Sequence, residues 1–195
     1  MAAKTRTPRA TWIDEGLCAL AAGGPEAVRV ENLAQALGVT KGGFYWHFAD
    51  RGALLAEMLD RWELVMVDAV IEEVESKGGD ARTRLRRLFG LGASADDLLG
   101  IELAVRDWAR RDPEVAERVR RVDNRRMAYL RRLFRELYDD PAEVEMRCFV
   151  VMALFVGNPS VAAEHGRRSR SAVMKDTLRW LVGQADPGVE PPATS

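Results

Sequence analysis

Apolar residues recur along this chain at helical spacing, and β-branched alternation of the kind seen in half-buried strands is absent. Between the stop signals, this pattern predicts about nine helices and therefore an all-α fold. The first helix covers about 9–23 and ends at Gly23-Gly24-Pro25. Its predicted inner positions are Ile13, Gly16, Leu17 and Leu20.

Two short helices separated by a glycine are predicted next. An amphipathic segment covers 30–37, and its inward positions are Leu33, Ala34 and Leu37. Gly38 stands where this helix stops, because glycine adopts the left-handed conformation at little cost. Val39 is an apolar plug, and Thr40 offers a hydroxyl at the N-cap of the second helix. This layout is that of a helix-turn-helix, whose second helix enters the major groove of DNA.

The second of these helices has an unusual composition. Gly42 and Gly43 each cost roughly 1 kcal/mol of helix propensity relative to alanine, so a need for a small surface close to a phosphate or base edge is indicated. Phe44 and Phe48 are four residues apart and can anchor the helix inward. The remaining side chains supply a cation, a phenol, an indole and an imidazole: Lys41, Tyr45, Trp46 and His47. An aromatic-rich core helix is the alternative, but glycines, a lysine and a histidine suit a core poorly.

The segment from Val39 to Leu55 resembles the recognition-helix signature of the TetR/AcrR family of transcriptional regulators, and residues 9–20 resemble the first helix of that family. The resemblance covers roughly residues 8–60, and the remainder is similar only in its helical organisation. It implies a three-helix DNA-binding head at 1–50 and a helical ligand-binding and dimerisation body at 51–185. The polar, proline-containing segment 186–195 is predicted to be a disordered tail.

The resemblance also implies which residues contact DNA. By position, the contacts with the DNA backbone are Thr40, Tyr45, His47 and Arg51, and the residues that approach base edges are Lys41, Gly42, Gly43 and Trp46. Lys41 bound to a guanine edge would be the commonest type of specific contact. An alternative for His47 is a hydrogen-bonded packing role between two aromatic residues.

Three further cations are assigned with alternatives. Arg6 and Arg9 belong, with Lys4, to a basic arm that the resemblance brings near the DNA backbone, and the alternative is a solvated start of the chain. Arg29 stands where the family often has a small hydroxyl residue that caps the second helix, and it can reach a phosphate instead.

The predicted body starts with a long helix over about 51–77, capped by Asp50 and ended by Lys77-Gly78-Gly79. Its predicted stripe is Leu55, Leu59, Trp62, Met66 and Val70. Helices over about 80–92 and 95–111 follow, with inner positions that include Leu85, Leu88, Phe89, Leu98, Leu99, Leu103 and Trp108.

Asp112-Pro113 and Asp140-Pro141 each open one further helix, because aspartate caps and proline fits the first helical position. The helix after Pro113 is rich in arginine, which is compatible with binding nucleic acid. Interleaved acids favour a solvated face laced with salt bridges instead.

The last two helices are predicted to form a homodimer. The run 146–156 is apolar on nearly all sides, so it needs a partner surface, and self-association is the simplest source. In the TetR family the final two helices form a four-helix dimer interface, which corresponds here to about 141–184. Pro159 either bends the penultimate helix or ends it, with a restart at Ser160.

Composition is that of a soluble protein: 195 residues, 47% hydrophobic, 30% charged and a net charge of −1. No apolar run approaches about 18 residues, so no membrane span is expected. The N-terminus lacks the apolar segment of a secretory signal, and Cys18 and Cys148 are predicted to be reduced and buried. We therefore expect a cytoplasmic protein.

The sequence thus predicts a dimeric regulator that binds a near-palindromic DNA operator. A small apolar or aromatic effector would release it from a pocket between the helix of 51–77 and the penultimate helix. The candidate lining residues are Trp62, Met66, Trp108, Tyr129, Phe149 and Met152, for each of which plain core packing is the alternative. Repression relieved by ligand is the hypothesis, and activation or ligand-free architectural binding remains open.

Two other classes of protein are the alternatives to a regulator. An enzyme is not expected, because His47 and His165 are far apart and no catalytic, metal or cofactor motif is present. Glu102 and Asp107 are interpreted as surface charges. A helical protein-interaction module without specific DNA binding is the second alternative, and the basic arm and the 41–48 run argue against it.

Overall fold

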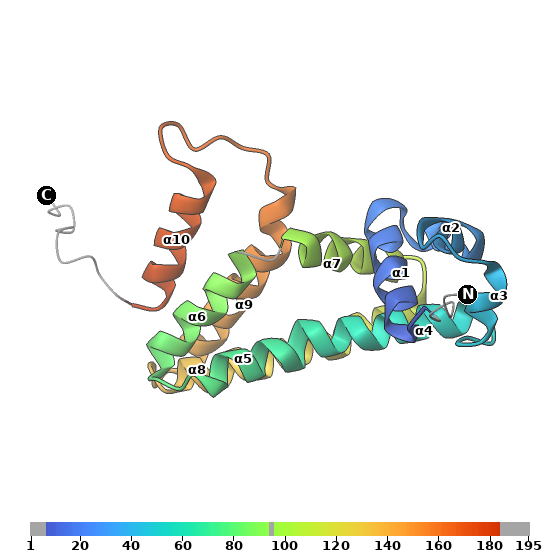
Figure 1. Ribbon diagram of the computed structural model, residues 1–195. Coiled ribbons are helices and arrows are strands. Elements are labelled where there is room, and N and C mark those ends of the chain that lie inside the picture. Colours follow the sequence, from blue (N-terminus) through green and yellow to red (C-terminus); the bar gives the residue numbers. More distant parts are fainter. Residues whose placement is uncertain (1–6, 94–95, 184–195) are drawn as a thin grey trace, which may run out of the picture. The chain divides into compact units, whose positions relative to one another are not determined.

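The computed structural model describes residues 7–93 and 96–183, and these form the predicted all-α fold without a strand (Figure 1). The α-helices are α1 (Arg9–Gly23), α2 (Val30–Ala36), α3 (Lys41–Tyr45), α4 (Arg51–Glu63), α5 (Val70–Ser76), α6 (Ala81–Ala93), α7 (Asp96–Ala109), α8 (Pro113–Arg135), α9 (Pro141–Gly157) and α10 (Arg170–Leu181). Within the described ranges, no helix combines the length and the apolar character needed to cross a bilayer.

The chain forms two compact units. The first comprises residues 1–70 and 95–126, and the second comprises 71–94 and 127–195. The first unit therefore holds α1 to α4 together with α7 and the beginning of α8. The predicted head of 1–50 and body of 51–185 divide the chain by function, and that division stays a prediction. The predicted tail, 186–195, lies outside the described residues.

Local side-chain chemistry sets most helix ends of the first unit as predicted. Gly38 follows α2 with φ +64°, a conformation that glycine adopts without steric cost. The Asp50 carboxylate accepts a hydrogen bond from the Ala53 N–H at 2.8 Å and caps α4. Asp112 accepts from the Glu114 N–H at 3.0 Å at the start of α8. Thr40 stands at the N-cap of α3, but its side chain makes no capping hydrogen bond, so that detail of the prediction is wrong.

The predicted long helix of 51–77 is helical but not uniform. A π-helical segment, η2 (Leu64–Ala69), lies between α4 and α5. A π turn contains more residues than an α turn, so the inward positions no longer follow one period. Leu59, Trp62 and Met66 are buried as predicted, whereas Leu55 and Val70 are only half-buried. The positions buried in addition are Leu54, Met58, Val67 and Val74.

Glu102 is fully buried, so its interpretation as a surface charge is wrong. One carboxylate oxygen accepts hydrogen bonds from Arg106 Nε at 2.7 Å and Arg126 Nη1 at 2.9 Å. The other accepts from Arg126 Nη2 at 3.0 Å and from the Trp62 indole N–H at 3.1 Å. Arg106 also donates to both oxygens of Asp123, at 3.0 and 2.6 Å. Two acids and two guanidinium groups thus balance in charge and join α4, α7 and α8.

The remaining arginines of α8 behave largely as predicted, as members of salt bridges. Arg118 lies 2.5 Å from an Asp60 oxygen and 2.8 Å from a Glu63 oxygen, so its partners belong to α4 rather than to α8. Arg131 pairs with Glu145 of α9 at 2.6 Å. These ion pairs connect neighbouring helices within each unit, which explains why so many arginines face one side of α8.

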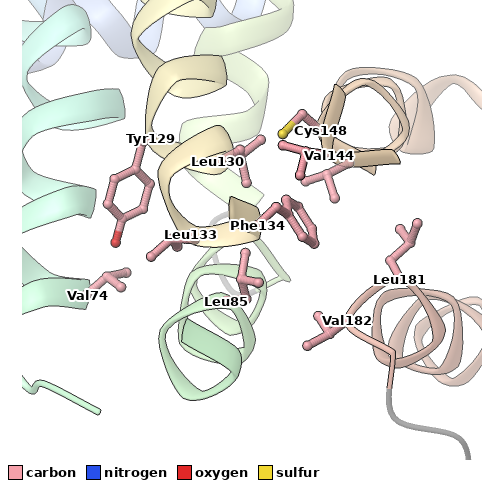
Figure 2. Packing of buried hydrophobic residues seen from close by; sticks show 11 residues of the cluster. Val74, Leu85, Tyr129, Leu130, Leu133, Phe134, Val144, Cys148, Leu181 and Val182 are labelled. Atoms are coloured by element: carbon pink, nitrogen blue, oxygen red, sulfur yellow. The ribbon is translucent and has the colours of Figure 1, made fainter. Parts of the chain in front are cut away.

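The second unit has its own apolar core, which Figure 2 shows. Side chains of α8 meet those of α5, α6, α9 and the end of α10, and the labelled members are Val74, Leu85, Tyr129, Leu130, Leu133, Phe134, Val144, Cys148, Leu181 and Val182. Burial raises the pKa of the Cys148 thiol to about 11, which keeps it protonated at neutral pH. Cys148 is buried as predicted, but Cys18 is exposed, contrary to the prediction.

Pro159 ends the penultimate helix rather than bending it. The α-helix stops at Gly157 and continues only as a 3-10 turn over Asn158–Ser160. No restart occurs at Ser160, because residues 161–169 are not helical and α10 begins at Arg170. Ser169 caps α10 by accepting a hydrogen bond from the Ala172 N–H at 3.1 Å.

The Glu102 cluster generates a stability prediction. Glu102→Gln keeps the shape of the side chain but removes the charge between Arg106 and Arg126. We expect the free energy of unfolding to fall by about 3–5 kcal/mol at pH 7, because a buried guanidinium pair loses its counter-charge. Urea denaturation measures this loss. The exposed Glu114→Gln is the matched control and should change stability by less than about 0.5 kcal/mol.

The same variant should also change the pH dependence of stability. Burial raises the pKa of Glu102, but the guanidinium groups of Arg126 and Arg106 outweigh burial and hold the pKa below its ordinary value. Such a carboxylate stabilises the fold above its unfolded pKa of about 4.3, and the contribution disappears as the pH falls through the folded pKa. The stability gap between the wild type and Glu102→Gln should be widest near neutral pH and narrow in acid. A gap that stays constant down to the acid limit of folding would contradict this role.

Candidate nucleic-acid interface

An aromatic cluster fixes α3 on α1. The ring centroids of Trp12 and Phe44 are 5.5 Å apart in an edge-to-face arrangement, and those of Phe44 and Phe48 are 5.2 Å apart and stacked. Trp12 and Phe44 are fully buried, and Phe48 is 2% exposed. The prediction that Phe44 and Phe48 anchor this segment is confirmed. Trp12 was not predicted to face inward, although tryptophan next to a helix of aromatic residues is a signal for such packing.

The opposite side of α3 is exposed. Tyr45 is 61% exposed and Trp46 is 74% exposed, although both adjoin a buried phenylalanine. Lys41 and Gly42 are also exposed, so this face carries a cation, a phenol and an indole. A core role for the whole helix is therefore wrong. Large aromatic side chains held in water by a rigid base are typical of a binding surface.

The two glycines of α3 are not required by the fold. Neither has a positive φ, and a Cβ atom at Gly42 would meet only the Thr40 hydroxyl at 3.7 Å. At Gly43 it would touch Trp12 at 3.6 Å, an ordinary van der Waals distance. Alanine would fit at both positions, so a reason for glycine has to come from outside the chain.

Two of the predicted DNA-contacting arginines have partners within the first unit. Arg9 donates to Glu57 through Nε at 2.8 Å and to the His47 carbonyl at 2.5 Å, and its guanidinium lies 4.6 Å from the centre of the Phe48 ring. Arg51 donates to the Val28 carbonyl at 2.6 Å and also to the Pro25 carbonyl. Both arginines tie helix ends together, and their contacts with the DNA backbone stay predictions.

The other flanking residues vary in their surroundings. His47 is half-buried, and its Nε2 lies 2.9 Å from the Thr7 carbonyl, which fits the alternative packing role. Arg29 is exposed and donates to the Glu26 carbonyl at 3.1 Å. Arg6 lies outside the described residues.

Lys41 has a partner that the sequence analysis missed. Its Nζ donates to the Glu31 carboxylate at 2.5 Å, which joins the first turn of α3 to the first turn of α2. The hydrogen bond from Lys41 lowers the pKa of Glu31. The spacing of ten residues across a helix-turn-helix is the signal that might have identified this pair, since it brings the two helix starts together.

The six predicted ligand-pocket residues are not gathered in one cavity. Trp62 and Met66 line a cavity of about 290 Å³ in the first unit, and Trp108 lines a separate hollow of about 810 Å³ in the same unit. Tyr129 lies in the core of the second unit, where its hydroxyl donates to Glu75 at 2.7 Å. Met152 packs half-buried against that core, and Phe149 is 67% exposed.

Comparisons with known proteins agree with this geometry. Residues 13–58 match the family model of the bacterial regulatory proteins, tetR family. Curated protein sequences give no match. Among solved structures, the TetR-family transcriptional regulator PfmR from Thermus thermophilus has a TM-score of 0.62 at 19% identity, over 88% of this chain and 96% of that one.

Two further solved structures share the fold. The fatty acid degradation regulator FadR from Bacillus halodurans has a TM-score of 0.66 at 18% identity, over 92% of this chain and 97% of that one. A candidate transcriptional regulator from Saccharomonospora viridis in complex with choline has a TM-score of 0.73 at 20% identity, over 89% and 94%. The helix-turn-helix of α2 and α3, its exposed outer face and the match over 13–58 together show that this chain is a DNA-binding transcriptional regulator and belongs to the TetR family.

Proposed function

We propose that this regulator binds a near-palindromic operator as a homodimer and represses transcription until a small apolar or aromatic ligand releases it. Residues 1–50 are the reading head in this proposal, and 51–185 supply ligand binding and dimerisation. The observation that carries it is the outer face of α3, where Tyr45 and Trp46 are held in solvent by the buried Trp12–Phe44–Phe48 cluster. A rigid helix that presents a cation and two aromatic groups suits insertion into the major groove.

The proposed contacts follow from exposure. Lys41, Gly42, Gly43 and Trp46 approach base edges, while Thr40 and Tyr45 contact phosphates. Arg9, Arg51 and His47 would mainly support the head from within, because each has a partner inside the first unit. A dimer carries two such heads, so the half-sites would lie one helical turn of DNA apart or a multiple of it.

The dimer proposal is supported by apolar side chains in solvent on the last two helices. Met146 and Phe149 of α9 are 57% and 67% exposed, and Trp180 of α10 is 70% exposed. The two helices pack against each other within the second unit. Large exposed apolar groups on neighbouring helices mark an interaction surface, and a second copy of the same helices would cover them.

The effector proposal is supported by the cavity of about 290 Å³ in the first unit. Leu17 of α1, Val65 and Met66 of η2 and Ile101 of α7 are among its lining residues, so the lining is mainly apolar. The choline complex of the Saccharomonospora viridis protein shows that a protein of this fold can hold a small molecule. An apolar or aromatic compound fits the lining here better than a cation. Because α1 belongs to the head, a ligand that favours one position of α1 would shift the head, provided that it binds that state better.

Fluorescence anisotropy with labelled duplex from upstream of the protein's own gene tests the proposal. We expect tight binding with a steep dependence on salt, and weak binding of an unrelated duplex. The Lys41→Ala/Tyr45→Ala variant should lose the difference between the two duplexes while its thermal unfolding stays unchanged, because both side chains are exposed. An effector should then release the bound duplex in the same cuvette. No binding even at low salt would contradict the proposal and favour a protein-interaction module.

Gly42→Ala separates the demands of the fold from those of DNA. The added methyl group has room, so the free energy of unfolding should stay unchanged or rise by up to about 1 kcal/mol. Operator affinity should nevertheless fall at least about tenfold, because the backbone of α3 can no longer approach the groove as closely. Gly90→Ala, at an exposed position of α6 with open space around it, is the matched control and should leave operator affinity intact. Full affinity of Gly42→Ala would remove close backbone approach from the mechanism.

Phe149→Asp tests the dimer surface. Light scattering after size exclusion should give twice the chain mass of 21.7 kDa for the wild type and a single chain mass for the variant. A buried unpaired carboxylate at the centre of the interface is the physical reason. Leu64→Asp, at a 48% exposed apolar residue of η2, is the control and should remain dimeric. A dimeric Phe149→Asp variant would place the interface elsewhere.

A further inference from the structure

The helix-turn-helix carries only two formal charges, and they are paired with each other. From Val30 to Ala49 the sole acid is Glu31 and the sole lysine or arginine is Lys41. They start α2 and α3 respectively, and Lys41 Nζ lies 2.5 Å from the Glu31 carboxylate. The proposed reading surface therefore presents one cation and one anion side by side.

Stability does not explain this pair. The side chains of Lys41 and Glu31 are 56% and 59% exposed, and ion pairs in solvent contribute little to folding. The two helices are already anchored by buried apolar side chains, among them Leu33 and Ala34 of α2 and Phe44 of α3. An acid at this place also repels phosphates, so it lowers affinity for DNA of any sequence. Its presence calls for a gain of another kind.

The chemistry of base edges supplies that gain. In the major groove a guanine offers the acceptors O6 and N7, and its paired cytosine offers the N4 amino donor beside them. Lysine donates to guanine, and glutamate accepts from cytosine N4. A Lys–Glu pair at hydrogen-bonding distance thus has the same donor–acceptor order as a G·C pair.

We propose that Glu31 is a specificity-determining residue of this regulator, which reads a cytosine amino group next to the guanine bound by Lys41. The inference rests on the proposed function, in which α3 lies in the major groove. On DNA without a G·C pair at that position, Lys41 stays with Glu31, and the carboxylate finds no donor and faces the groove unpaired. Glu31 therefore rejects other sequences as well as recognising the correct one.

Selection from a random duplex library, followed by anisotropy on single-base-pair variants of the selected operator, tests this inference. For the wild type we expect one G·C pair in each half-site whose replacement by A·T weakens binding at least about fivefold. In Glu31→Ala that ratio should fall below about twofold, while the other positions keep theirs. Affinity for random duplex should rise, and the slope of log K against log salt should steepen by up to about one, because Lys41 becomes free for a phosphate.

Two variants control the experiment. Glu26→Ala removes an exposed acid of the same charge from the turn before α2, and it should leave the preference at the G·C position unchanged. Lys41→Met should lose discrimination at the same base pair as Glu31→Ala, which a purely structural ion pair would not produce. Thermal unfolding of each variant should match the wild type, since all three side chains are exposed.

The outcomes separate this inference from the function on which it rests. If the wild type selects an operator and Glu31→Ala selects it with the same ratios at every position, Glu31 has no role in specificity and the inference is overturned. A uniform rise in affinity with unchanged ratios also overturns it, because Glu31 would then act only as a general repellent. A wild type that selects no sequence overturns the proposed function itself.

Discussion

Packing of Trp12 against Phe44, and of Phe44 against Phe48, determines which way α3 presents its other side chains. The helix has only five residues and contains two glycines, so it cannot be stable by itself. Because Phe44 is fully buried on α1, its neighbours Tyr45 and Trp46 are turned into solvent. The orientation of the reading surface is thus a consequence of apolar burial on the other side of the same short helix.

Charged groups of the first unit serve two different purposes. Arg9 and Arg51 bind carbonyl and carboxylate oxygens of the head and hold its helix ends in place. Glu102 does the same more deeply, between Arg106 and Arg126, and it joins α7 to α8 beneath Trp62. The pair of Lys41 and Glu31 differs because it is exposed and lies on the proposed reading surface. Its partners are therefore to be sought outside the chain.

Sequence patterns predicted the parts of the fold that depend on local chemistry. Caps such as Asp50 and Asp140, and the positive φ of Gly38, follow from neighbouring residues alone, and the structure confirms them. The burial of Glu102 could not be predicted in this way, because Arg126 comes from a helix 24 residues later. The inward face of α7 was wrong for the same reason: Glu102 and Val105 are buried, while Leu98 and Leu103 are only half-buried. The candidate DNA surface was predictable as a segment, but the internal partners of Arg9, Arg51 and Lys41 depend on tertiary contacts.

Hydroxyl-radical footprinting of the protein with and without operator duplex tests the central claim most directly, that the outer face of α3 contacts DNA. Tyr45 and Trp46 are exposed and should be oxidised readily in the free protein. We expect the duplex to protect both, while the oxidation of Trp180 in α10 stays the same, since that residue lies in the second unit and outside the head. Unchanged oxidation of Tyr45 and Trp46 in a protein that is demonstrably bound to the duplex would contradict the account.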